Sequence, residues 1–215
     1  MGTAIDDGSE ELGTSIPQWY SLCEKAIPPS LTLYKGEMRF SIMFEDKTMF
    51  SMDTQRAKDD IDGKGKKKGR IDPSSRKGTG KINVHIKECF DLPSADMDGF
   101  SDPYCKCYLL PLRTTKSKRK TPTIKHSLNP VWDYKFEYMV DYEDLAMHGI
   151  EFTVWDWDRG VRNDFLGCCR INLGTHEDMW NDAKGIEVEA WQHLIENPNT
   201  WKEFLIPLRS KRDPR

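Results

Sequence analysis

Several signals that would place this chain in or across a membrane are missing from it. Its 215 residues contain no apolar run of the roughly 18 residues that a membrane-spanning helix needs. The first residues, MGTAIDDGSEELG, have neither the basic region nor the apolar core of a secretion signal. Asp6 stands where a myristoylation signal has Ser or Thr. These absences favour a cytoplasmic location, with any membrane contact peripheral.

Signatures of zinc binding and of catalysis are missing as well. The chain has 6 cysteines and 5 histidines but no C-x-x-C pair, so zinc has no support. In a chain without a secretion signal we expect the cysteines to be reduced and packed as small apolar residues. Asp156 and Asp158 resemble an acid–base pair, but no nucleophile motif or glycine-rich phosphate loop accompanies them. A binding module is therefore favoured over an enzyme.

What the chain does contain is a series of short strand patterns. GEMRFSIMFED (36–46) and KINVHIK (81–87) alternate apolar and polar residues, as half-buried strands do. Only 185–197 favours a helix, with Val188, Trp191, Leu194 and Ile195 as its apolar face. Seven or eight strands with turn-rich links and one late helix predict an all-β fold, an antiparallel β-sandwich. The other expected strands are 104–110, 134–140, 150–157, 165–173 and 201–208.

Two stretches lack such patterns. Residues 1–15 are acidic and rich in Gly and Ser, which predicts disorder. Residues 47–80 are rich in Lys, Gly, Asp and Ser, which predicts a flexible insertion between the first two strands. DDIDGKG within this insertion imitates the start of an EF-hand loop, but Lys64 and Ile71 occupy ligand positions. No EF-hand site is expected there.

Acidic residues concentrate in two loops, DLPSADMDGFSDPY (91–104) and VWDWDRGVRNDFLG (154–167). Alternate loops of a sandwich collect at one end, so both loops could share one rim. Carboxylates about 4 Å apart repel by about 1 kcal/mol even in water. Calcium, which accepts 6–8 oxygen ligands in irregular geometry, relieves that repulsion better than magnesium or zinc. The candidate ligands are Asp96, Asp102, Asp156, Asp158 and Asp164.

A simpler explanation for these acids remains open, because aspartate is common in turns, where its side chain bonds the local backbone. For Asp98 we expect this turn role alone. The paired spacing in two loops, each following an inferred strand, favours calcium for the other five.

The segment 113–130 contains no acidic residue. On a strand, Lys116, Lys118 and Lys120 would form one cationic stripe, with Arg119 on the opposite side and Lys125 after the bend. An anionic leaflet attracts such residues by about 1 kcal/mol each, and phosphoinositide headgroups concentrate the charge. The alternative is a solubilising edge strand. Nucleic acid is not expected, because the chain is acidic overall and the stripe lacks interleaved aromatic residues.

Three motifs, in order, carry a family resemblance: LPSADMDGFSDPY, KTPTIKHSLNPVWDYKF and VWDWDRGVRNDFLG. They resemble the loops and strands of a C2 domain of the synaptotagmin superfamily. AKGIEVEAWQHLIENPNTWKEFLIPLRS is similar to the end of the second C2 domain of synaptotagmin-like proteins of the granuphilin type. WYSL (19–22) resembles the closing strand of a preceding C2 domain. The resemblance implies an eight-stranded C2 sandwich over 31–210, a disordered tail with a domain remnant in 1–30, and a tail at 211–215.

The resemblance also implies a function. All five candidate aspartates match the family's calcium ligands, as in rabphilin and Doc2, whereas many second C2 domains of synaptotagmin-like proteins have lost some. Met97 and Val161 occupy loop tips that would enter a membrane. The expected function is calcium-dependent phospholipid binding in vesicle trafficking and exocytosis, at the plasma membrane or a secretory vesicle.

The basic segment matches the family's polybasic patch, which binds phosphatidylinositol 4,5-bisphosphate and sometimes SNARE proteins. The alternative function is therefore a calcium-independent adaptor for phosphoinositides or SNARE proteins. The Rab-binding region of such proteins has no counterpart in this sequence, so no Rab site is expected.

Overall fold

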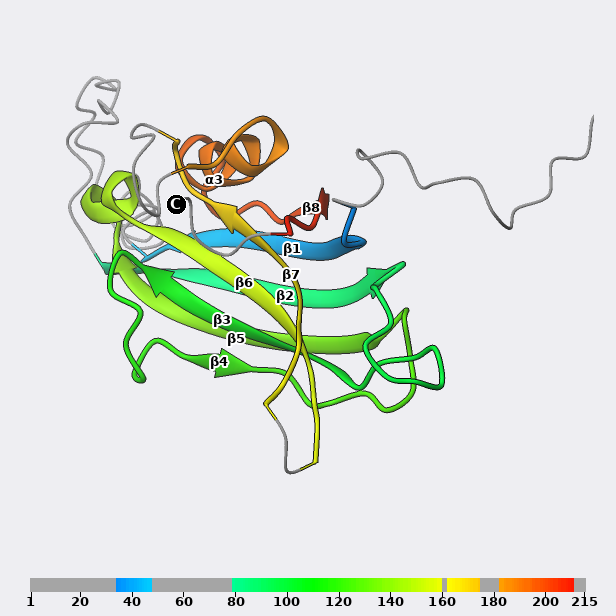
Figure 1. The fold of residues 1–215 in the computed structure, drawn as a ribbon. Coiled ribbons are helices and arrows are strands. Elements are labelled where there is room, and N and C mark those ends of the chain that lie inside the picture. The colour runs from blue at the N-terminus through cyan, green and yellow to red at the C-terminus, as the bar shows by residue number, and fades with distance from the viewer. Residues whose placement is uncertain (1–33, 48–78, 160–161, 175–181, 211–215) are drawn as a thin grey trace, which may run out of the picture. The chain divides into compact units, whose positions relative to one another are not determined.

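The computed structural model describes residues 34–47, 79–159, 162–174 and 182–210. Within them, eight strands form two antiparallel four-stranded sheets (Figure 1). The first sheet has the order β5-β2-β1-β8 and the second β4-β3-β6-β7. The strands are β1 (Glu37–Asp46), β2 (Thr79–Phe90), β3 (Pro103–Leu110), β4 (Arg119–Lys120), β5 (Val131–Asp141), β6 (Gly149–Asp156), β7 (Phe165–Ile171) and β8 (Lys202–Pro207); the helices are η2 (Tyr142–Met147, 3₁₀) and α3 (Ile186–Glu196). The all-β sandwich predicted from the strand patterns is confirmed.

The core lies between the inner faces of the two sheets. Alternate residues of β1 and β2 point into it, so that Met38, Phe40 and Ile82 are fully buried. Phe40 stacks on Phe152 of β6 with ring centroids 5.0 Å apart, which joins the first sheet to the second. The alternation in 36–46 and 81–87 therefore predicts the inward faces correctly.

Strand β6 is buried on both faces, unlike the half-buried strand that its alternating pattern suggests. Phe152 and Val154 face the core, while Glu151 and Thr153 on the other face have no exposed surface either. Glu151 is tolerated there because Arg170 and Arg113 pair with it, at 3.0 and 2.7 Å. A buried carboxylate needs such partners to remain charged.

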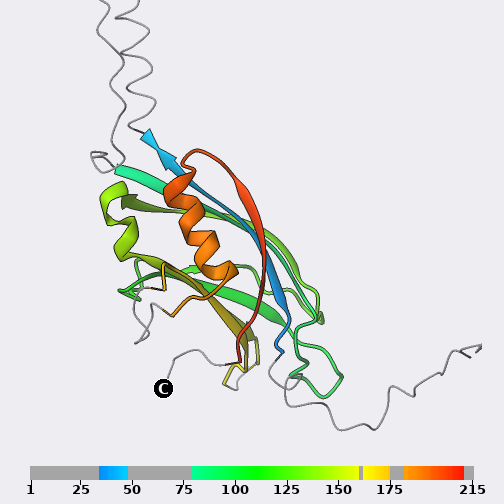
Figure 2. The ribbon, with the colours of Figure 1, turned by 90° about the horizontal axis from the view of Figure 1, so that it is seen from above.

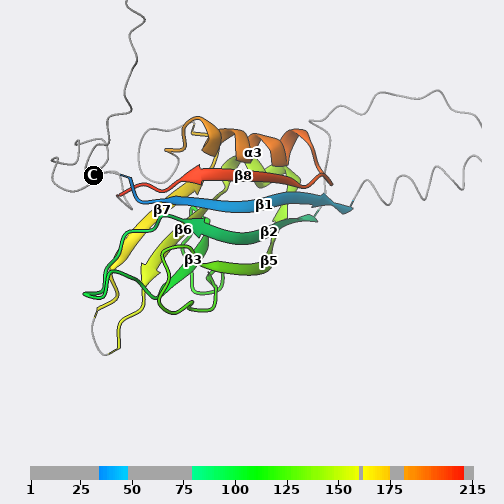
Figure 3. The same cartoon turned by 90° about the vertical axis from the view of Figure 1, so that its right-hand side faces the viewer.

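Helix α3 contacts β1, β7 and β8, and so covers the side of the sandwich where the two sheets end (Figure 3). Figure 2 shows it beside η2, and Trp191 Nε1 donates a hydrogen bond to the Leu145 carbonyl at 2.9 Å. The helix predicted at 185–197 is thus confirmed to within a residue at each end. Its buried face differs slightly: Val188 is half-buried, and Glu187 is buried because Arg209 pairs with it.

The basic segment departs from the prediction of one continuous strand. Strand β4 comprises only Arg119 and Lys120, and residues 115–117 form a turn. The Thr114 hydroxyl accepts a hydrogen bond from the Ser117 amide at 3.2 Å, which closes this turn. The strand expected for the lysine stripe is therefore wrong at Lys116, which lies in the turn, and at Lys118, which precedes β4.

The five cysteines in the described residues are buried and free. Burial raises the pKa of Cys168 to about 12, and it raises the pKa of the Cys89 thiol well above its usual value. These groups are packed as small apolar side chains, as expected from the sequence.

Several expectations fall outside the described residues. They concern the domain remnant in 1–30, residues 48–78 of the insertion expected over 47–80, the loop tip at Val161 and the tail at 211–215. The end of that insertion was predicted too late, because Thr79 and Gly80 already belong to β2. Where the structure describes helices, none has the length and apolarity needed to cross a bilayer.

Candidate functional site

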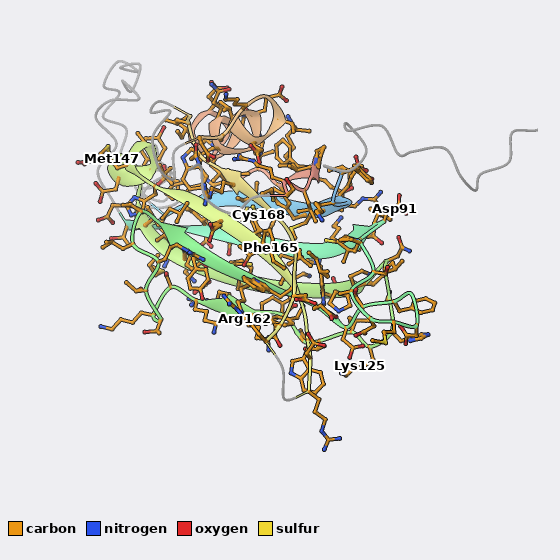
Figure 4. All side chains as sticks on the ribbon, in the orientation of Figure 1. Asp91, Lys125, Met147, Arg162, Phe165 and Cys168 are labelled. Atoms are coloured by element: carbon orange, nitrogen blue, oxygen red, sulfur yellow. The ribbon has the colours of Figure 1, made fainter. Side chains whose placement is uncertain are left out.

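The two acidic loops lie at the same end of the sandwich. One runs from β2 to β3 and the other from β6 to β7, and β3 and β6 pair so that Pro103 faces Asp156. The Trp157 amide donates to the Asp102 carbonyl at 3.1 Å, which ties the two loops together. Figure 4 shows Lys125 and Arg162 at this end and Met147 at the other.

Three of the five candidate aspartates converge. Carboxylate oxygens of Asp96, Asp156 and Asp158 all lie within 4.8 Å of one another. Asp156 has no exposed surface, and its Oδ1 accepts a hydrogen bond from the Asp102 amide. Its Oδ2 is buried and has no hydrogen-bond partner in the part of the chain that the structure describes. A buried, unpartnered carboxylate oxygen is costly unless a cation binds it.

The electrostatics of this cluster follow from burial and like charge. Burial, together with the negative charges of Asp96 and Asp158, raises the pKa of Asp156 above its usual value. Burial and the neighbouring aspartates likewise raise the pKa of Asp96. An all-oxygen donor set of this kind fits calcium, whereas zinc prefers nitrogen or sulfur.

The other two candidates flank the cluster. Asp102 accepts the His126 amide on Oδ1 at 2.9 Å, and the Lys125 ammonium on Oδ2. Burial alone would raise the pKa of Asp102, but these bonds outweigh it and lower the pKa. Asp164 accepts the Asp156 amide through its main-chain carbonyl at 2.9 Å, while its side chain is exposed.

The tip of the first loop carries two exposed apolar side chains beside its aspartates. Met97 is fully exposed, and Phe100 stacks on the His126 ring with centroids 3.8 Å apart. Asp98 accepts a hydrogen bond from the Phe100 amide at 3.0 Å, the local turn bond expected for it. Trp157 in the second loop is partly exposed. The sequence interpretation omitted Phe100 and Trp157, although their place beside the aspartates was a signal for them.

A second cluster, of lysines and aromatic rings, lies along β3, β4 and β6. Lys106 faces Lys120 across the strand pair, and its ammonium lies 4.4 Å from the Trp155 ring centroid. The Lys120 ammonium lies 4.0 Å from the centroid of Tyr104. Burial, and then the charge of Lys118, lowers the pKa of Lys106. We call Lys106, Lys118 and Lys120 the lysine patch.

The sequence interpretation missed Lys106, although it alternates with the buried cysteines of β3 and so must point outward. Arg119 lies on the other side of β4, as predicted, where its guanidinium donates to three backbone carbonyls, including that of Glu137 at 3.2 Å. Lys125 lies with Asp102 and not with the lysine patch.

A family model described as "C2 domain" matches residues 80–194, so the chain belongs to the C2 domain family. Its relatives include synaptotagmin-like protein 2 from Bos taurus, 31% identical over 199 residues, and the same protein from Mus musculus, 32% identical. Each match covers 89% of this chain and 19% or 18% of the relative, so the chain spans about a fifth of their length. The predicted resemblance to synaptotagmin-like proteins is confirmed.

A solved structure agrees on the fold. The third C2 domain of the KIAA1228 protein is 19% identical and superposes with a TM-score of 0.52, covering 84% of this chain and 92% of that one. A C2 domain of RIM from Drosophila is 22% identical with a TM-score of 0.47, covering 80% of this chain and 98% of that one.

Proposed function

We propose that this chain is a calcium-dependent phospholipid-binding module. The observation that carries the proposal is the buried, unpartnered Oδ2 of Asp156, which lies among the carboxylates of Asp96 and Asp158. These three residues would hold calcium, with Asp102 and Asp164 as the flanking ligands. When bound, calcium supplies positive charge and open coordination positions for the phosphate oxygens of lipids.

The chain's own residues would then contribute in three ways. Without a cation, the carboxylate cluster repels an anionic membrane. Met97 and Phe100 would contact the interface from the loop tip, since both are exposed there. The lysine patch would bind phosphoinositide phosphates, with Tyr104 and Trp155 fixing the ammonium groups of Lys120 and Lys106.

The relatives support a biological setting for this activity. Membership of the C2 family and similarity to synaptotagmin-like proteins support a role in vesicle trafficking or exocytosis, peripheral on a cytoplasmic membrane surface. A binding module of this kind needs no catalytic step.

The second candidate function is a calcium-independent adaptor for phosphoinositides or SNARE proteins. The lysine patch favours it, because the ammonium groups of Lys106 and Lys120 lie over aromatic rings of β3 and β6 and not against the acidic loops. In that case Asp156 and its neighbours would have no role in membrane binding.

Cosedimentation with phosphatidylserine liposomes, with and without calcium, separates the two functions. We expect calcium to increase binding at least tenfold, and the Asp156→Asn/Asp158→Asn variant to lose this increase. Calcium-independent binding that the variant leaves intact would instead favour the adaptor.

The lysine patch is tested with liposomes that contain phosphatidylinositol 4,5-bisphosphate. Lys118→Ala/Lys120→Ala should weaken binding by roughly thirtyfold, because each lysine near the surface contributes about 1 kcal/mol. Lys135→Ala/Lys184→Ala removes the same charge from exposed positions elsewhere and is the control. Equal losses in both variants would make the patch a general electrostatic surface.

A further inference from the structure

Lys125 is held beside Asp102 by the backbone on both sides of it. The Ile124 amide donates to the Pro103 carbonyl at 3.0 Å, and the Ser127 amide donates to the Ser101 carbonyl at 2.8 Å. The short segment that carries Lys125 therefore runs along the start of β3, next to Asp102. The position of this lysine is fixed by main-chain hydrogen bonds and does not depend on its side chain alone.

The side chain of Lys125 makes two further contacts at the acidic loops. Its ammonium donates to Asp102 Oδ2 and lies 3.7 Å from the centroid of the Trp157 ring. An ion pair and a cation–π contact together direct one ammonium group more firmly than either does alone. Trp157 and Asp102 are themselves linked through the Trp157 amide.

These contacts leave Asp102 without a free oxygen. His126 N–H occupies Oδ1 and Lys125 occupies Oδ2. Asp102 is also absent from the group of carboxylates that lie within 4.8 Å of one another. A divalent cation that used Oδ2 of Asp102 would compete with the ammonium for the same oxygen and would be repelled by its charge.

We propose that Lys125 is a tethered counter-cation that competes with calcium for Asp102 and thereby sets the calcium affinity of the site. This inference rests on the proposed function. In the metal-free protein the ammonium neutralises one carboxylate at the edge of the cluster. When calcium binds, the ammonium leaves Asp102 and the Trp157 ring.

Replacement of Lys125 by methionine keeps the apolar stem and removes the charge. The competitor for Asp102 is lost, and so is the repulsion between the ammonium and the incoming cation. Both effects act in the same direction, so Lys125→Met should bind calcium roughly three- to tenfold more tightly than the wild type. The metal-free variant should also unfold at a lower temperature, because the carboxylates lose their counter-charge.

Isothermal titration calorimetry measures the affinity in the wild type, in Lys125→Met and in Lys116→Met, which removes the same charge from an exposed turn. Lys116→Met should stay within about twofold of the wild type, and Lys125→Arg, which keeps the charge, should do the same. NMR of the Lys125 side chain gives a second readout. Its ε-methylene protons should be shifted upfield by the Trp157 ring and should move to ordinary lysine positions when calcium is added.

The possible outcomes are distinct. Tighter binding by Lys125→Met alone, with movement of the Lys125 signals, supports the counter-cation. Calcium binding that appears only in Lys125→Met supports the competition by Lys125 but contradicts the proposed function, because the wild type then binds no calcium. Equal affinity in the wild type and Lys125→Met overturns this inference and leaves the proposed function standing. Equal tightening in Lys116→Met overturns it too. If neither the wild type nor Lys125→Met binds calcium, the proposed function fails and the inference fails with it.

Discussion

Among the described residues, two groups of buried carboxylates have opposite surroundings. Glu151 and Glu187, behind the second sheet, are paired with arginines: Arg170 lies 3.0 Å from Glu151, and Arg209 pairs with Glu187. Asp156, at the loop end, has two aspartates beside it and no ion pair with Arg or Lys among the described residues. In the first group, arginines neutralise the glutamates, and these ion pairs stabilise the fold. Under the proposed function, calcium from solution would supply the missing counter-charge for Asp156.

The arginine-paired region should be the more sensitive to mutation. Arg170→Met removes one of the two arginines that pair with the fully buried Glu151 among the described residues, so we expect the free energy of unfolding to fall by about 3–5 kcal/mol. Urea unfolding monitored by circular dichroism measures the change. Arg113→Met is the matched control, and because Arg113 is partly exposed its loss should be smaller, at about 1 kcal/mol. Equal losses in the two variants would contradict the account.

Neutralising one carboxylate in each region should change stability in opposite directions. Asp156→Asn keeps the Oδ1 acceptor and removes repulsion, so the metal-free protein should be stabilised by roughly 1 kcal/mol. Glu151→Gln removes the charge that Arg170 needs, so that variant should be destabilised.

Thermal unfolding with and without calcium measures both variants. Calcium should raise the unfolding temperature of the wild type and of Glu151→Gln, but not that of Asp156→Asn. A destabilised metal-free Asp156→Asn protein would show that the cluster is a structural element like the Glu151 region.

We expect the smallest changes in stability when the pH is varied. Asp96 and Asp156 have pKa values raised above 3.8, so as pH falls through them the folded state takes up protons before the unfolded chain does, and their repulsion is relieved. Asp102 has a lowered pKa, so its bonds stabilise the fold above pH 3.8 and are lost as pH falls through that lowered value. Carboxyl ¹³C shifts of the metal-free protein should give midpoints above 3.8 for the first two residues and below it for Asp102. Three indistinguishable midpoints would refute this distinction.

The sequence predicts the sandwich and the acidic loops because both depend on local patterns. Alternation in β1 and β2 identifies the inward residues, and the aspartates follow strand ends within a few positions. The pairing of Glu151 with Arg170 and Arg113 is not visible in this way, since the partners come from another strand and another loop. The alternation of apolar and polar residues in β6 does not indicate that the face with Glu151 and Thr153 is also buried.

The same reasoning explains the outcome for the basic residues. Alternating lysines indicate a stripe only where the backbone is extended, and the turn closed by Thr114 and Ser117 removes Lys116 from it. Lys106 joins the lysine patch because of the register between β3 and β4, and Lys125 reaches Asp102 because its segment bonds to the start of β3. Both placements depend on pairings between distant segments.

The register of β1 and β2 has a consequence for how this domain tolerates change. Asp46 pairs with Gly80, so the ends of the two strands that flank residues 47–78 lie side by side. From there β2 runs 12 residues, about 40 Å, to the start of the first acidic loop. The entropic cost of closing a loop grows only slowly with its length, so we expect this junction to tolerate inserted residues with little loss of stability. A peptide tag or a folded domain inserted there should leave the spacing of the carboxylates unchanged, because the insertion point lies at the opposite end of the sandwich.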